Sequence, residues 1–226
     1  EVEKGAYPIF VAKDAVLGTF NSSHPNASLI KERGLTQEEL ENVFIHSKYK
    51  TWKAIDNRFS DSSLGVYVRS DAAGAAETWA KFFDKTQEDL KGVGIFGDPG
   101  VAQAIKDSPN AIGFNNINYV YDLQTKKTTA NIEVIPIDQN KNGKIDPEEN
   151  FYADLDELTE AVALGKYPSP PTRELLFVIK NDNNSKLIKE FIRFILDKNQ
   201  QGYLLENGYV PLTDQQRAHE LDKLNR

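Results

Sequence analysis

The spacing of hydrophobic residues divides the chain into short extended runs and stretches with a helical period. The extended runs predict strands at 8–20, 65–70, 111–120, 128–137 and 174–180. The helical periods predict helices at 37–46, 75–83, 100–107, 155–165 and 185–197. Because the two kinds of segment alternate along the chain, the pattern predicts an α/β fold built in layers.

Two long apolar strands, 8–20 and 174–180, lie near the two ends of the chain and bracket its middle. A chain that crosses twice between two lobes gives this layout, and ligands of such proteins bind in the cleft between the lobes. The helix at 185–197 carries an apolar stripe that is expected to face a core. The polar tail from Thr213 is expected to be peripheral.

Composition narrows the class of protein. The chain has 226 residues, a net charge of −7 and no stripe of Lys and Arg, which argues against nucleic acid as a partner. No apolar run approaches the roughly 18 residues that a membrane-spanning helix needs. There is no cysteine, which is compatible with an extracytoplasmic protein. There is also no methionine, so we expect the chain to begin after processing or at an artificial boundary, with any signal peptide out of view.

The segment VYVRSDAAGAAETWAKFF, at 66–83, has the chemistry of an anion site. A predicted strand ends at Arg69, a turn passes through Gly74, and a helix opens at Ala75. The free N–H groups and the dipole of the first helical turn attract anions. Arg69 offers a planar fork of donors that Asp71 can hold in orientation. The alternative is an Arg–Asp surface pair before an ordinary helix.

This segment also resembles the phosphate-binding proteins of ABC transporters, whose loop reads Arg-x-Asp-Gly-Ser-Gly-Thr. Five further stretches are similar to segments of that family and follow the same order. They are VAKDAVLGTFN at 11–21, the segments 34–55, 97–119 and 167–180, and GYVPL at 208–212. The resemblance therefore extends over nearly the whole chain.

The resemblance implies the two-lobed α/β fold of the type II periplasmic binding proteins, with one lobe complete and the other partial. Lobe II would comprise residues 18–174, and the partial lobe I would comprise residues 1–17 and 175–226. The family's first βαβ region, with its Thr-Gly-Ser-Ser loop and acceptor Asp, would precede residue 1 and is expected to be missing.

By position, the resemblance assigns the anion site to Arg69, Ser70, Asp71, Ala73, Gly74 and Ala75. Arg69 would bind the oxyanion, Asp71 would brace it, and the backbone N–H groups of Gly74 and Ala75 would donate. Ala73 and Ala75 stand where the family has Ser and Thr hydroxyls. Two lost hydrogen bonds, at about 1.5–3 kcal/mol each, would weaken binding by roughly a hundredfold or more, so an anion other than phosphate remains open.

The segment DQNKNGKIDPEE, at 138–149, has the spacing of an EF-hand calcium loop. The expected ligands are Asp138, Asn140, Asn142, the carbonyl of Lys144, Asp146 and Glu149. The alternative is an Asn/Asp/Gly-rich surface turn. Because a strand precedes this single loop, we expect a structural Ca²⁺ that holds strand 128–137 to helix 155–165, and not a sensor that opens on binding.

No catalytic motif accompanies these features. His24, His46 and His219 are scattered without metal spacing and are expected at surface or helix-end positions. We therefore predict a non-enzyme: a monomeric, periplasmic or cell-surface solute-binding protein that captures phosphate or a related oxyanion for an ABC transporter permease. The alternative, favoured by the two alanines in the anion loop, is a calcium-dependent extracellular binding or adhesion module that has lost anion binding.

Overall fold

The computed structural model describes residues 5–180 and 185–224 of the chain. Within them the strands are β1 (Ala6–Phe20), β2 (Gly65–Arg69), β3 (Val93–Ile95), β4 (Ala111–Asn116), β5 (Glu133–Val134) and β6 (Thr172–Lys180). The α-helices are α1 (Ala27–Arg33), α2 (Gln37–Phe44), α3 (Gly74–Lys81), α4 (Gly97–Asp107), α5 (Ile117–Val120), α6 (Leu155–Ala163), α7 (Lys186–Leu196), α8 (Lys198–Glu206) and α9 (Asp214–Lys223). The mixture of strands and helices confirms the predicted α/β class.

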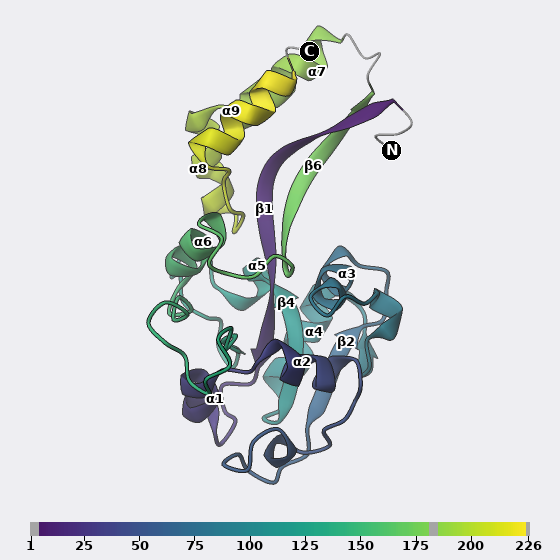
Figure 1. Ribbon diagram of the computed structural model, residues 1–226, viewed down its shortest axis with the longest axis vertical. Coiled ribbons are helices and arrows are strands. Elements are labelled where there is room, and N and C mark those ends of the chain that lie inside the picture. Colours follow the sequence, from purple (N-terminus) through teal and green to yellow (C-terminus); the bar gives the residue numbers. More distant parts are fainter. Residues whose placement is uncertain (1–4, 181–184, 225–226) are drawn as a thin grey trace.

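The strands form a sheet in the order β3-β2-β4-β1-β5, and β6 pairs with β1 outside this path. β2 is parallel to β3 and β4, whereas β1 is antiparallel to β4, β5 and β6. One end of β1, at 16–20, pairs with β4, and the other end, at 6–15, pairs with β6. The two strands that the sequence placed near the chain ends therefore lie side by side, as a ribbon that extends away from the sheet (Figure 1).

The core beneath the sheet is built around one aromatic side chain of α3. Trp79 is fully buried, stacks on Phe114 of β4 at 5.7 Å between ring centroids, and meets Phe44 of α2 edge-on at 5.4 Å. Phe82 and Phe83 pack against the same indole, which confirms that these aromatic residues share one side of the segment. Buried aromatic pairs of this kind contribute about 0.5–1.5 kcal/mol each beyond their area burial, so the packing holds α3 against β4 and α2.

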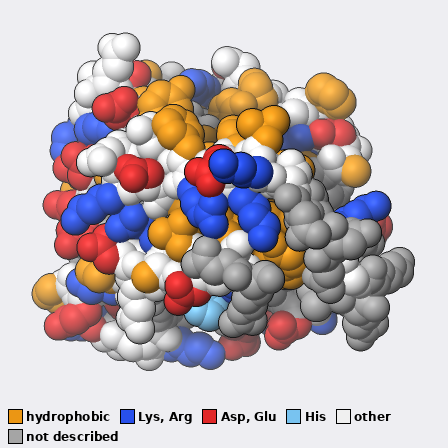
Figure 2. Space-filling view, turned by 90° about the horizontal axis from the view of Figure 1, so that it is seen from above, with side chains coloured by type: hydrophobic (Ala, Val, Ile, Leu, Met, Phe, Trp, Pro, Cys, Tyr) orange, Lys and Arg blue, Asp and Glu red, His pale blue; other side chains and the backbone are white. Residues whose placement is uncertain are grey.

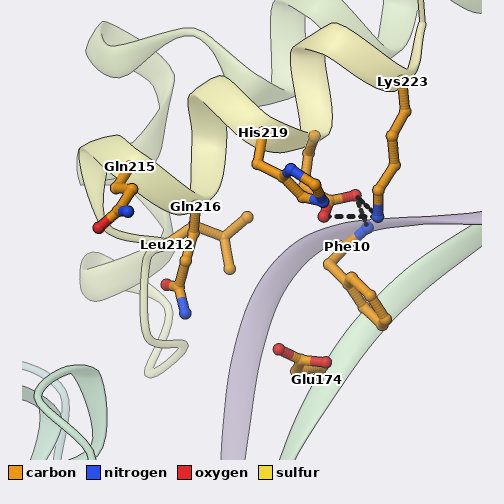
Figure 3. A pocket seen from close by; sticks show the side chains of 8 residues that line it. Phe10, Glu174, Leu212, Gln215, Gln216, His219 and Lys223 are labelled. Atoms are coloured by element: carbon orange, nitrogen blue, oxygen red, sulfur yellow. Dashed lines mark hydrogen bonds and ion pairs between the residues drawn. The ribbon is translucent and has the colours of Figure 1, made fainter.

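The helices α7, α8 and α9 lie along one side of the β1–β6 ribbon (Figure 1). Glu220 of α9 is 4% exposed, and its carboxylate accepts the N–H of Phe10 at 3.0 Å. Lys223 lies 2.7 Å from the same carboxylate and 4.9 Å from the centre of the Phe10 ring (Figure 3). The prediction of a peripheral tail is therefore wrong, because this polar helix buries a satisfied carboxylate against β1.

An apolar face remains exposed on β6 and α7. The predicted core-facing stripe of α7 is correct for Ile192 and Leu196, which are buried, and wrong for Leu187, which is 79% exposed. The other exposed apolar side chains of these two elements are Leu176, Phe177, Val178, Ile188, Phe191 and Phe194. Viewed from the end that carries α7, hydrophobic side chains lie open between Lys and Arg side chains (Figure 2).

Three further predictions need correction. Of the strand predicted at 128–137, only β5 is regular, and isolated bridges hold the rest near Thr128 and Ile137. The strand predicted at 111–120 turns into the short helix α5 after Asn116. His24 is buried, not at the surface, because it packs on Trp52 at 4.5 Å between ring centroids. This burial lowers the pKa of His24 to about 4.

Among the described helices, none is long and apolar enough to cross a membrane.

Candidate functional site

The turn from β2 into α3 leaves the start of the helix without a side-chain cap. Ala73 occupies the N-cap position in extended conformation and offers no side-chain acceptor to the helix. Gln87 fixes the turn instead, because its side chain accepts the N–H of Ala73 at 2.9 Å and donates to the carbonyl of Asp71 at 2.7 Å. The N–H groups of the first helical turn have no intrahelical partners, so this end of α3 can accept an external anion.

Arg69 ends β2 shortly before α3 begins, and two carboxylates hold its side chain in place. Its Nε and Nη2 atoms donate to Asp71 at 2.9 and 2.5 Å, as the sequence predicts, and its Nη1 lies 2.8 Å from Asp98 at the start of α4. The side chain is only 8% exposed. The guanidinium and the N–H of Gly97 hold the pKa of Asp71 well below its usual range. A guanidinium has more N–H groups than these contacts use, so donors remain for a ligand.

A second arginine, which the sequence analysis did not single out, meets the same helix start. Nη1 of Arg173 lies 2.5 Å from the position that a Cβ on Gly74 would occupy, so a side chain at residue 74 could not share this space. Arg173 belongs to β6 and donates to the carboxylate of Asp14 on β1 at 2.6 and 3.2 Å. These two residues are direct partners in the β1–β6 register, so the ribbon brings Arg173 to α3.

Asn116, at the end of β4, connects Asp98, which contacts Arg69, to Arg173. Its amide nitrogen donates to Asp98 at 3.2 Å, and its amide oxygen accepts from Arg173 at 3.3 Å. Burial raises the pKa of Asp14, against the opposing effect of Arg173, and the nearby charge of Asp98 raises it further. With every group ionised, the two arginines face three carboxylates. An anion bound here would therefore depend on directed N–H donors and not on a surplus of positive charge.

The structure confirms the predicted contact between Arg69 and Asp71, and Gly74 begins α3. Ser70 instead lies exposed, and its N–H donates to the carbonyl of Ile95, which continues the pairing of β2 with β3. Ala75 is buried, and its side chain belongs to the hydrophobic core beneath the sheet. The residues that sequence reasoning missed are Asp14, Asp98, Asn116 and Arg173. The available signal was that these four residues lie in 11–21, 97–119 and 167–180, three of the segments that resemble the family.

The predicted calcium loop, residues 138–149, closes on itself through hydrogen bonds from its backbone N–H groups to its own side chains. Asp138 is buried, and its two carboxylate oxygens accept the N–H groups of Asn142 at 3.2 Å and Gly143 at 2.8 Å. Gly143 has φ of 80°, a left-handed conformation that glycine adopts without steric cost. The N–H of Ile145 donates to the carbonyl of Glu32 at 2.7 Å, which ties the loop to α1.

Two carboxylates near the end of this loop, those of Asp146 and Glu149, have different kinds of partner. Glu149 is buried and accepts the backbone N–H groups of Gln139 and Asn140 at 2.9 and 3.1 Å. Asp146 is ion-paired with Lys144 at 2.5 Å, and this contact together with neighbouring amides lowers the pKa of Asp146 to about 2. Among the described residues, no three His, Cys, Asp or Glu side chains are arranged to hold a metal ion. Calcium binding therefore stays a prediction.

Comparison with known proteins places this geometry in context. Residues 3–199 match the family model of the PBP superfamily domain. The phosphate-binding protein PstS of Bacillus subtilis is 26% identical over 201 residues, which cover 88% of this chain and 57% of that protein. The phosphate-binding protein PstS of Methanocaldococcus jannaschii is 23% identical over an alignment of 265 residues, which covers 93% of this chain and 65% of that protein. The chain therefore spans less than two thirds of the length of these two relatives.

A solved structure from Clostridium perfringens shows the same fold. It is described as a putative phosphate ABC transporter substrate-binding protein with bound phosphate. The TM-score is 0.67 at 18% sequence identity, over 94% of this chain and 74% of that chain. The likeness confirms the predicted fold class, a mixed α/β fold of the kind found in phosphate-binding proteins.

Proposed function

Because the chain belongs to the PBP superfamily, we propose that it captures a phosphate ion at the start of α3. The observation that carries this proposal is an uncapped helix N-terminus reached by Arg173, with Arg69 linked to Arg173 through Asp98 and Asn116. Arg69 supplies free N–H groups from β2, and Arg173 reaches Gly74 from β6. Guanidinium forks and helix N–H groups together match the oxygens of a tetrahedral oxyanion.

The excess of carboxylates favours phosphate over sulfate. Asp14, Asp71 and Asp98 outnumber the two arginines around the site. An anion without a proton would meet repulsion from these groups. Phosphate keeps a proton at neutral pH and can donate it to a carboxylate, whereas sulfate has no proton to donate.

Calorimetric titration of the chain at pH 7 with phosphate, sulfate and molybdate tests the proposal. We expect saturable binding of phosphate and at least tenfold weaker binding of sulfate. At about 100 times the Kd, phosphate should stabilise the fold by about 2.7 kcal/mol, which a thermal-shift measurement would detect. A folded chain that binds none of these anions would overturn the proposal, and equal binding of sulfate would contradict the role given to the carboxylates.

Delivery to a transporter is the second part of the proposed function. The named relatives are binding proteins, which supports a binding role rather than catalysis. We propose that the chain acts as an extracytoplasmic monomer and passes phosphate to an ABC transporter permease. The description of the Clostridium perfringens protein supports this role.

We further propose that residues 18–174 form one lobe and that 1–17 with 175–226 form part of a second. Two separate hydrophobic clusters support this division except at its boundary, where Ala15, Val16, Leu17 and Val210 pack into the cluster of the first lobe. One lies beneath the sheet and the other joins β1, β6, α7 and α9. The exposed apolar face of β6 and α7 supports the view that the second lobe packs against further polypeptide.

We also propose that the loop 138–149 binds a structural Ca²⁺. Its ligands would be Asp138, Asn140, Asn142, the carbonyl of Lys144, Asp146 and Glu149. Oxygen donors of this kind fit a hard cation, and two of the carboxylates are already buried in the loop. The ammonium of Lys144 now satisfies Asp146, so Ca²⁺ would replace one cation with another.

Calcium is expected to raise the melting temperature of the chain, and Glu149→Gln is expected to remove this effect. The glutamine keeps an oxygen for the backbone N–H groups of the loop but loses the charge and the bidentate carboxylate. At about 100 times the Kd, calcium should add about 2.7 kcal/mol to the free energy of unfolding. Asp61→Asn, at an exposed carboxylate remote in sequence from the loop, serves as the control. Equal melting temperatures in calcium and in chelator would contradict the proposal.

A further inference from the structure

The turn between β2 and α3 is held by a side chain that comes from outside it, that of Gln87. Its amide oxygen accepts the N–H of Ala73 at 2.9 Å, and its amide nitrogen donates to the carbonyl of Asp71 at 2.7 Å. These partners lie 14 and 16 residues before Gln87 in the chain. The side chain therefore closes the turn through one acceptor and one donor, in a contact that is not local in sequence.

Glutamine is chemically suited to this position. A side-chain amide carries an acceptor and a donor on the same group, so it can pair with a backbone N–H and a backbone C=O at once. An ionised glutamate has no donor, a lysine has no acceptor, and an apolar side chain has neither. Replacing Gln87 by any of these residues would break at least one of its two contacts with the turn.

The backbone around Gln87 is itself tied in place. Its N–H donates to the carboxylate of Glu77, in the first turn of α3, at 3.1 Å. The preceding Thr86 and the following Asp89 form a capping box, in which the N–H and hydroxyl of Thr86 both donate to Asp89 at 3.0 Å. Because these contacts fix the backbone against α3, the amide of Gln87 has a defined position relative to the start of that helix.

The turn that Gln87 holds connects two groups of donors in the candidate phosphate site. The carboxylate of Asp71 accepts Nε–H of Arg69 at 2.9 Å and the N–H of Gly97 at 3.1 Å. Ala73 is the N-cap residue of α3, so the free N–H groups of the first helical turn follow it directly. A shift of the turn would therefore change the position of Arg69 relative to these N–H groups.

We propose that Gln87 is a positioning residue for phosphate binding. It fixes Asp71, and through Asp71 the guanidinium of Arg69, relative to the start of α3. The inference rests on the proposed function, because it concerns the same site. Ala73 has no side-chain acceptor for the helix, so Gln87 supplies from a distant part of the chain the order that a serine or threonine N-cap gives locally.

Hydrogen exchange followed by NMR, without phosphate, tests the positioning itself. Gln87→Met keeps a long side chain but loses both hydrogen bonds, so the N–H of Ala73 and Nε–H of Arg69 should exchange at least about tenfold faster. Gln103→Met is the matched control, because Gln103 is an exposed glutamine whose amide donates to Asp107 at 2.8 Å. Unchanged exchange at Arg69 in a folded Gln87→Met variant would overturn the proposal.

Titration calorimetry with phosphate at pH 7 tests the consequence for binding. Gln87→Met should weaken binding about tenfold, as the loss of two neutral hydrogen bonds of modest net strength predicts, and Gln103→Met should leave it unchanged. If the parent chain binds phosphate, an affinity of folded Gln87→Met within about threefold of the parent would overturn this inference alone. If the parent chain binds none, the proposed function fails, and the exchange measurement still decides whether Gln87 positions Arg69.

Ala73→Ser separates positioning from a general loss of stability. A serine at this N-cap position can accept an N–H of the first turn and order the start of α3 without Gln87. A hydrogen bond from its hydroxyl to phosphate would add the same affinity in the parent chain and in Gln87→Met. The gain in Gln87→Met should therefore exceed the gain in the parent by at least about threefold. Equal gains in the two backgrounds would overturn the role given to Gln87 at the helix start.

Discussion

Arg69→Gln is expected to abolish measurable phosphate binding. The guanidinium is 8% exposed and is oriented by Asp71 and Asp98, so its remaining N–H groups point from a fixed position. Two charge-assisted hydrogen bonds, at about 1.5–3 kcal/mol each, correspond to a loss of at least roughly a hundredfold in affinity. The loss should exceed this estimate, because both carboxylates would then face the anion without their counter-charge.

Arg69→Lys is expected to recover only a small part of the affinity. An ammonium is a compact point charge and cannot hold Asp71 through two parallel bonds, reach Asp98 and bind a ligand at the same time. Titration calorimetry of both variants measures these effects. Arg58→Gln is the matched control, because Arg58 is an exposed arginine paired with a carboxylate, Asp56, outside the site. Phosphate affinity in a folded Arg69→Gln variant within threefold of the parent chain would contradict this role.

The sequence alone predicts those contacts of the site that form between residues close together in the chain. Arg69 and Asp71 are two residues apart at the end of one strand, and the helix that starts at Gly74 follows directly. The capping box of α2, in which Thr36 and Glu39 exchange hydrogen bonds, is another contact between residues close in the chain. Short-range spacing determines such contacts before any tertiary structure forms.

The rest of the site depends on strand register, which one sequence does not reveal. Asp14 and Arg173 are 159 residues apart and meet only because β1 and β6 pair in one register. A shift of one residue would send both side chains to opposite faces. The polar helix α9 was misjudged for a related reason. Its buried contact rests on Glu220, a residue type that composition assigns to the surface.

Gly74→Ala is expected to weaken phosphate binding about tenfold or more, with little loss of stability. A Cβ at this position would lie 2.5 Å from Nη1 of Arg173, so the flexible end of the arginine must move away from the helix start. Removing one charge-assisted donor costs about 1.5–3 kcal/mol, which is at least a tenfold change in Kd. Alanine also suits a helix better than glycine, by up to about 1 kcal/mol, so the fold should tolerate the change.

Gly202→Ala is the matched control for this variant. It makes the same substitution inside α8, where a Cβ would meet no atom within 4 Å. We expect it to leave phosphate affinity unchanged and to give a similar gain from helix propensity. A comparable loss of affinity in both variants would mean that the effect at Gly74 has nothing to do with Arg173.

A double-mutant cycle with Arg173→Gln then decides how Gly74 acts. Arg173→Gln alone should weaken phosphate binding by about tenfold to a hundredfold. Its fold should survive, because burial already raises the pKa of Asp14, so that this carboxyl can take up a proton when its partner is lost. If the Cβ at residue 74 acts only by displacing Arg173, the double variant should bind phosphate as weakly as Arg173→Gln does and no more weakly. Additive losses would instead mean that the Cβ obstructs the anion itself, and that Arg173 is not the reason residue 74 is glycine.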